Sequence, residues 1–201
     1  MTRQSSLYKK THDYVFENAP RLPYHNAKHA FKVAGEARRL AIIEWLDKDS
    51  IFLLEIAGLL HDIVYNVGSN DNEEKSMEVA RGVMPKLGFK SYEIDIICRL
   101  IMATKWPTKP RDRLEKIICD ADVANFGSPD FFEYNDALIR EMLDVESLSL
   151  RDRIRWYERT LDFLMSHRYY TQAAIDMYGS GKEANIKKIG DMIKELKVQP
   201  I

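Results

Sequence analysis

The sequence predicts an all-α fold. Apolar residues recur at spacings of three and four along nearly every segment, whereas the alternation typical of half-buried strands is hard to find. Links that carry proline, glycine or serine, such as KWPTKP and FGSPD, separate these segments. With 201 residues and 45% hydrophobic residues, the chain is long and apolar enough for one globular domain with a single core.

The first three helices are predicted from their apolar stripes. Residues 5–17 form the first helix, which the loop NAPRLPY ends. The second runs from Asn26 to about Leu46. Asp49 or Ser50 is expected to cap the third, SIFLLEIAGLLHDI, which is apolar almost all round and therefore central. The stripe of the second helix consists of Ala30, Val33, Ala37, Leu40 and Ile43.

The remaining helices follow the loop VYNVGSN. Asn70, followed three residues later by Glu73, resembles a capping box, and Gly88 is expected to end the helix that begins there. Further helices are predicted at 91–104, 111–122, 130–143, 149–167 and 182–197.

Composition excludes several kinds of partner. The formal net charge of −1 gives no basic field that would recruit extended nucleic acid or an anionic membrane. No apolar stretch approaches the roughly 18 residues that span a bilayer, and the N-terminal residues lack a signal-peptide core. A cytoplasmic location is the resulting expectation. Cys98 and Cys119 lie in apolar runs, so we expect buried free thiols.

Three short pieces carry the residues that could do chemistry. His61 and Asp62 end the most apolar helix, where burying them is costly unless something such as a cation satisfies them. Asp120 and Asp122 also follow an apolar run, EKIIC, so a carboxylate there could reach the same cleft. Each piece alone has a purely structural interpretation, as a helix-end salt bridge or a cap.

The third piece is the pair His25 and His29 in YHNAKHAFKV. Residues four apart lie on one face of an α-helix, so both imidazoles could reach one object, although such a pair often binds nothing. Two imidazoles and two carboxylates together would form a mixed nitrogen and oxygen site that suits Mn²⁺, Fe²⁺, Mg²⁺ or Zn²⁺.

These pieces, in this order, resemble the HD superfamily of metal-dependent phosphohydrolases. YHNAKHAFKV is similar to a signature of the class I cyclic nucleotide phosphodiesterases, as is HDIVYNVGSN. The segments NEEKS, ADVANFG and YNDALIRE resemble those of small, uncharacterised bacterial HD hydrolases. The resemblance implies an HD-domain helical bundle with a metal site in its central cleft. One domain, 1–201, would hold its motifs within about 20–142, with C-terminal helices 149–197 packed on that core.

The resemblance also implies roles for individual residues. Position by position, it makes His29, His61, Asp62 and Asp122 the metal ligands, with Asp120 available to orient a ligand histidine. His25 matches the phosphodiesterase histidine that protonates the leaving oxygen, although it could instead be a capping histidine.

One departure from the phosphodiesterase pattern limits the metal count. Tyr65 stands where those enzymes have a histidine three residues after the HD aspartate, and no histidine lies between His61 and His167. Dinuclear HD enzymes need extra histidines in that interval, so one divalent ion is expected.

Other residues are candidates for substrate contacts, each with a structural alternative. Glu73 or Glu74 could orient the attacking water, unless the first closes a capping box and the second is exposed. Lys105 is a candidate phosphate anchor, or an ordinary solvated lysine. The same choice between contact and structure applies to Lys28 and Arg140 as phosphate contacts, and to Tyr24 and Trp106 as stacking partners of a base.

The expected function is metal-dependent hydrolysis of a small phosphate ester, with nucleotides among the candidate substrates. A rival interpretation is a non-catalytic, metal-bearing domain that senses a nucleotide. A third is an interaction domain with a closed, tetrahedral structural metal. The sequence leaves open the substrate, the choice between monoester and diester, the identity of the metal and the oligomeric state.

Overall fold

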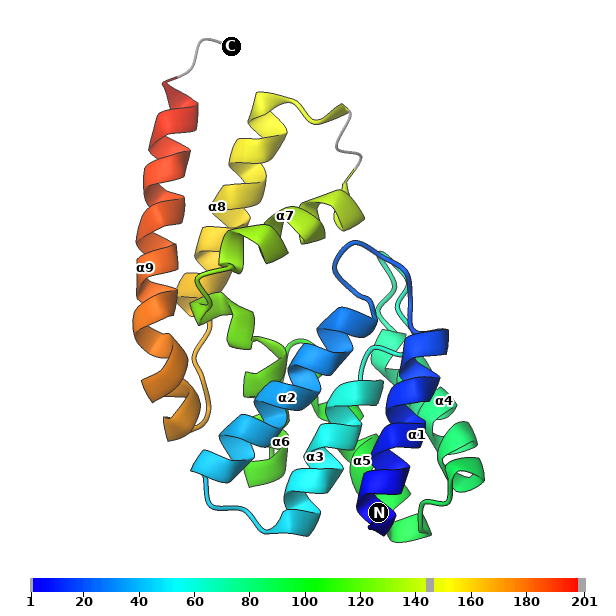
Figure 1. Cartoon of the computed structure of the whole chain (residues 1–201). Helices are drawn as coiled ribbons and strands as arrows, with labels where there is room; N and C mark the ends of the chain where they lie inside the picture. Colours follow the sequence, from blue (N-terminus) through cyan, green and yellow to red (C-terminus); the bar gives the residue numbers. More distant parts are fainter. Residues whose placement is uncertain (1, 144–146, 199–201) are drawn as a thin grey trace. The chain divides into compact units, whose positions relative to one another are not determined.

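The computed structural model describes residues 2–143 and 147–198 (Figure 1). These residues contain nine α-helices and one short 3₁₀ helix, with no strand beyond an isolated antiparallel bridge between Arg21 and Asn26. The all-α class is confirmed. By its internal contacts, the chain divides into two compact units, Met1–Val123 and Ala124–Ile201. The packing of helices 149–197 on the motif-bearing core, as parts of one domain, stays a prediction.

The first unit is built around α3. This helix contacts each of the other five helices of the unit, and eight of its residues are buried, including Leu54, Ile56, Leu59 and Leu60 (Figure 1). Its predicted central place is therefore confirmed. The helices of this unit are α1 (Arg3–Asn18), α2 (Ala27–Ile43), α3 (Lys48–Leu60), α4 (Asn72–Leu87), α5 (Ser91–Ala103) and α6 (Arg113–Asp122).

Helices α2 and α3 differ from prediction at the turn that joins them. α2 ends at Ile43 rather than near Leu46, because Trp45 adopts a left-handed backbone with φ of 57°. Ile43, placed on the buried stripe by prediction, is 45% exposed, whereas the other four stripe residues are buried. The cap of α3 is Asp47, whose carboxylate accepts hydrogen bonds from the backbone N–H groups of Asp49 and Ser50.

The capping box predicted at Asn70 and Glu73 is wrong. The cap of α4 is Asp71, one residue later, and its side chain accepts no capping hydrogen bond from the helix backbone. The side chain of Asn72 instead bonds the backbone of Asn66, which holds the preceding loop against the helix. Gly88 ends the helix as predicted, in the left-handed conformation that glycine favours.

The second unit consists of η1 (Ala124–Gly127), α7 (Phe131–Met142), α8 (Leu150–Ser166) and α9 (Gln172–Lys197). Its core contains Phe131, Leu164, Ile189 and Ile193. α9 begins ten residues earlier than predicted, since Thr171 caps it and Gly181 serves packing rather than a helix break. A Cβ on Gly181 would lie 2.1 Å from the carbonyl oxygen of Gly127, so only glycine allows η1 this close to α9.

A buried basic pair lies inside this second unit. Lys182 donates hydrogen bonds to the carbonyl oxygen of His167 over 2.7 Å and, over 3.3 Å, to its Nδ1. Burial, with the nearby charges of Lys182 and Arg168, lowers the pKa of His167 from 6.5 to about 4. His167 is therefore held neutral, with Nδ1 as the acceptor.

Stability is expected to fall when the pH drops below the ordinary pKa of histidine. Because the folded-state pKa of His167 is the lower one, the unfolded chain binds more protons between about pH 4 and pH 6.5. We expect the unfolding free energy to be lower at pH 5 than at pH 7 by about 1–2 kcal/mol on this account. Urea unfolding of wild type and His167→Phe at both pH values measures it, and equal pH dependence in the two proteins would contradict it.

The cysteine prediction is confirmed. Cys98 and Cys119 are buried free thiols, and the Cys119 thiol donates to the carbonyl oxygen of Ala103 over 3.1 Å. Among the described residues, no helix is long and apolar enough to cross a membrane.

Candidate metal centre

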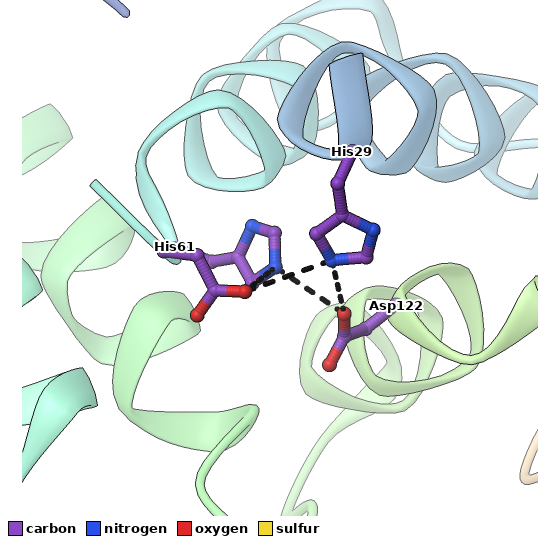
Figure 2. Close-up of side chains that lie close together, drawn as sticks. His29, His61 and Asp122 are labelled. Carbon is purple, nitrogen blue, oxygen red and sulfur yellow. Dashed lines mark ion pairs between the residues drawn. The ribbon is translucent and has the colours of Figure 1, made fainter. Parts of the chain in front are cut away.

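Four side chains from three segments of the first unit converge on one point. His29 comes from the first turn of α2, His61 and Asp62 directly follow α3, and Asp122 is the last residue of α6. Figure 2 shows the rings of His29 and His61 directed toward the carboxylate of Asp122. One ligand atom from each of the four residues lies within 4.8 Å of all the others. The structure therefore brings together the four residues that the family resemblance selected.

The separations between these atoms match those between the ligands of one small cation. His61 Nε2 lies 3.0 Å from Asp62 Oδ2 and 3.2 Å from Asp122 Oδ1. His29 Nε2 lies 3.3 Å from Asp122 Oδ1 and 3.6 Å from Asp62 Oδ2. Bonds of roughly 2.1 Å to a common ion place neighbouring ligand atoms about 3.0–3.4 Å apart. The side chains need only small adjustments to bind such an ion.

The hydrogen bonding of His61 shows that this point calls for positive charge. Its Nδ1 lies 2.9 Å from the carbonyl oxygen of Gly58, which only accepts, so Nδ1 carries the proton. Its buried Nε2 has no hydrogen-bond partner and faces the oxygens of Asp62 and Asp122. A lone pair facing two carboxylates is unfavourable unless a proton or a metal ion lies between them. The residues present therefore fit a cation.

The pKa shifts point the same way. Burial works to lower the pKa of His61, but the charges of Asp62 and Asp122 outweigh it and raise that pKa well above its ordinary value. Burial works to raise the pKa of Asp122, yet His61 and His29 hold it far below the ordinary range. The pKa of Asp62 is also lowered, because the charge of His61 outweighs burial. Both carboxylates are ionised and available as ligands.

The start of α2 fixes His29. The side chain of Asn26 accepts hydrogen bonds from the backbone N–H groups of Lys28 and His29, at 2.9 and 3.2 Å. His25 precedes this cap, so the two histidines do not form the helix-face pair that their spacing indicated. The chain turn closed by the Arg21–Asn26 bridge brings His25 close instead, with its Nε2 3.8 Å from Asp62 Oδ2.

Gly58 is a residue of the site that sequence reasoning missed. A Cβ at this position would lie 2.8 Å from both the backbone N and the Cα of Ala34, so α2 and α3 cross in near contact. The same glycine supplies the carbonyl that orients His61. Its sequence signal is a lone glycine, three residues before a histidine, inside a helix that is otherwise apolar.

Two further candidates lie beside the cluster. Burial raises the pKa of Glu73, and the charge of Asp62 adds to that rise. Lys105 forms an ion pair with Glu74, and it lines a cavity of about 360 Å³ together with Trp106 and neighbouring cations. Glu74 therefore competes with a phosphate for the Lys105 ammonium group.

The remaining candidates are Asp120, Lys28, Arg140 and Tyr24, and they differ in how they relate to the cluster. Asp120 is fully buried but does not belong to the four-residue group, and the group that orients His61 is Gly58. Lys28 and Arg140 are exposed. Tyr24 contacts the rings of both His25 and His29, with centroids 4.8 and 4.7 Å away, and so borders the cluster. Base stacking by Tyr24 stays a prediction.

Comparison with protein families decides the family. The model of the HD domain matches residues 26–125, a range that includes all four residues of the cluster. The chain is an HD-domain protein. In this HD domain, the histidine of α2, the His-Asp pair after α3 and the aspartate of α6 occupy one point. The comparison with curated proteins gives no match.

Solved structures share the fold of this HD domain over nearly the whole chain. Bacillus subtilis YpgQ in complex with ADP has a TM-score of 0.70 at 17% identity and covers 96% of this chain and 97% of its own. The Lin1889 protein of Listeria innocua has a TM-score of 0.65 at 20% identity, with 100% of both chains covered. A predicted HD superfamily hydrolase from an uncultured Thermotogales bacterium has a TM-score of 0.56 at 20% identity, covering 94% and 90%.

Proposed function

We propose that this HD-domain protein is a metal-dependent phosphohydrolase that cleaves a small phosphate ester. The observation that carries the proposal is the buried Nε2 of His61, which faces two carboxylates without a hydrogen-bond partner. Positive charge is needed between this nitrogen and the carboxylates, and a divalent ion supplies it without a proton on Nε2. His29, His61, Asp62 and Asp122 would hold one divalent ion, and Mn²⁺, Fe²⁺, Mg²⁺ and Zn²⁺ all suit this donor set.

The protein's own groups would handle the substrate around that point. A divalent ion held there supplies Lewis acidity, which polarises a phosphoryl oxygen and acidifies water. His25 donates a proton to the leaving oxygen, since its Nε2 lies on the Asp62 side of the cluster, 3.8 Å from that carboxylate. Glu73 orients the attacking water. The Lys105 ammonium group pairs with Glu74 in the free protein and with a phosphate of the bound substrate.

A nucleotide is the substrate class that we favour. YpgQ, which shares the fold, binds ADP in its crystal structure. Trp106 is 52% exposed beside Lys105, and an indole next to a cation suits a ligand that carries both a base and phosphates.

Hydrolysis of a panel of nucleotides, p-nitrophenyl phosphate and its diester tests this function, with the products of the nucleotides identified by chromatography and the release of nitrophenol measured for the other two. The protein is loaded with each of the four metals in turn. His25→Asn is expected to lower kcat by about 10²–10⁴-fold, the usual contribution of a general acid. His12→Asn is the matched control, because His12 stacks on Phe31 at 4.1 Å outside the cluster. It is expected to keep the wild-type rate.

Other outcomes would overturn the proposal. Tight binding of unhydrolysed nucleotide by the metal-loaded protein, without hydrolysis of any ester, would support the sensing domain instead. Metal binding with no effect of nucleotide or ester would favour a structural ion.

A further inference from the structure

Tyr65 is the residue in which this chain departs from the phosphodiesterase pattern, and its ring lies directly on His25. The two ring centroids are 3.4 Å apart and the planes are inclined by 12°, which is a stacked arrangement. His25 is 9% exposed, and the edge of Tyr24 also contacts its ring. Aromatic pairs in contact restrict each other's rotation, because a turn of either ring breaks the overlap.

The backbone on both sides of Tyr65 is held by α4. The buried Ser76 hydroxyl accepts from the N–H of Val64 and donates to its carbonyl oxygen, both at 3.1 Å. The buried Asn72 side chain accepts from the N–H of Asn66 at 2.9 Å and donates to its carbonyl oxygen at 3.1 Å. Buried side chains seldom satisfy both backbone groups of a loop residue unless that loop must keep one conformation.

Asn72 and Ser76 are the first and last residues of the NEEKS segment, one helical turn apart on the buried face of α4. The hydrogen bonds therefore flank Tyr65 symmetrically, on the residue before it and the residue after it. Both side chains bond the loop that carries Tyr65, so their effect on the site passes through that loop.

We propose that Tyr65 is a positioning residue that fixes the ring plane of His25, with its own place fixed by Asn72 and Ser76. This role rests on the proposed function of His25 as a proton donor. With the ring held, Nε2 of His25 stays directed to the Asp62 side of the cluster, 3.8 Å from the Asp62 carboxylate. Without the Tyr65 ring against one of its faces, the imidazole would have room to turn from that direction.

The test compares two variants: Tyr65→Leu removes the aromatic ring, whereas Tyr65→Phe keeps the ring and removes only the hydroxyl. Two esters, an alkyl phosphate and p-nitrophenyl phosphate, are assayed with metal-loaded protein. A proton donor matters most for a basic leaving group, so Tyr65→Leu is expected to lower kcat on an alkyl phosphate at least about tenfold. Its effect on p-nitrophenyl phosphate, whose leaving group needs no proton, is much smaller. KM changes little, and Tyr65→Phe recovers the alkyl phosphate rate.

NMR gives a readout that does not depend on turnover. The His25 ring protons lie over the Tyr65 face and are expected to resonate upfield in wild type and Tyr65→Phe, and to move downfield in Tyr65→Leu. Unchanged metal content and circular dichroism show that the variants fold. Unmoved His25 signals in Tyr65→Leu, or equal losses on the two esters, overturn the positioning role. Failure of the wild type to cleave any ester, the nucleotides and the diester included, overturns the proposed function instead.

Discussion

Replacing Asp62 by asparagine is expected to abolish most phosphate release. The amide keeps the size of the side chain but removes a negative charge that lies 3.0 Å from His61 Nε2. Because metal-based stabilisation of the transition state is worth several kcal/mol, kcat/KM is expected to fall by about 10³-fold. The rate of hydrolysis at saturating metal and at substrate concentrations from below to above KM, with metal content measured alongside, gives the result.

Asp95→Asn is the matched control for Asp62→Asn. Asp95 is exposed, pairs with Arg81 at 2.9 Å and does not belong to the cluster. An exposed ion pair of this kind contributes little to stability. If Asp62→Asn kept the same rate and the same metal content as Asp95→Asn, the cluster would not be the catalytic centre.

Gly58→Ala is expected to damage stability and metal binding together. Its new Cβ would meet backbone atoms of Ala34 at 2.8 Å, and backbone cannot give way as a flexible side chain does. Forcing α2 from α3 costs about 1–3 kcal/mol of unfolding free energy, as overpacking in a core does. The move also shifts His29 against His61 and disturbs the carbonyl that orients His61, so metal affinity is expected to fall about 10–100-fold.

Gly35→Ala, in the same helix as Ala34, separates this steric effect from the general effect of alanine. A Cβ on Gly35 meets nothing within 4 Å. Alanine there is expected to raise the unfolding free energy by up to about 1 kcal/mol, because helical glycine carries a backbone-entropy cost. Urea unfolding and metal titration on both variants give the comparison, and equal behaviour of the two would contradict the close crossing at Gly58.

The helices and the ligand set were the parts that the sequence could predict. Apolar periodicity located every helix, since burial of one face dominates helix placement. His29, His61, Asp62 and Asp122 came from ordered motifs, and the fold brings them within 4.8 Å of one another. Their role as metal ligands stays a proposal until metal is measured.

What the sequence could not predict depends on contacts between distant segments. The start of α9 was missed because Gly181 resembles a helix breaker, whereas its lack of a Cβ serves the crossing with Gly127. The capping box predicted at Asn70 and Glu73 is wrong because the Asn72 side chain bonds the backbone of Asn66 and the helix begins there, a contact that no local pattern reveals. The stacking of Tyr65 on His25 joins residues forty positions apart, and no local pattern encodes it.

The most direct test is the metal content of the purified protein. Wild type and Asp122→Asn are each incubated with Mn²⁺, Fe²⁺, Mg²⁺ or Zn²⁺ in turn, freed of unbound ion by gel filtration and subjected to elemental analysis. The geometry of the cluster predicts about one ion per chain in the wild type and almost none in the variant. A folded wild type that retains no ion of any of the four metals, or a variant that retains as much as the wild type, would contradict the metal centre.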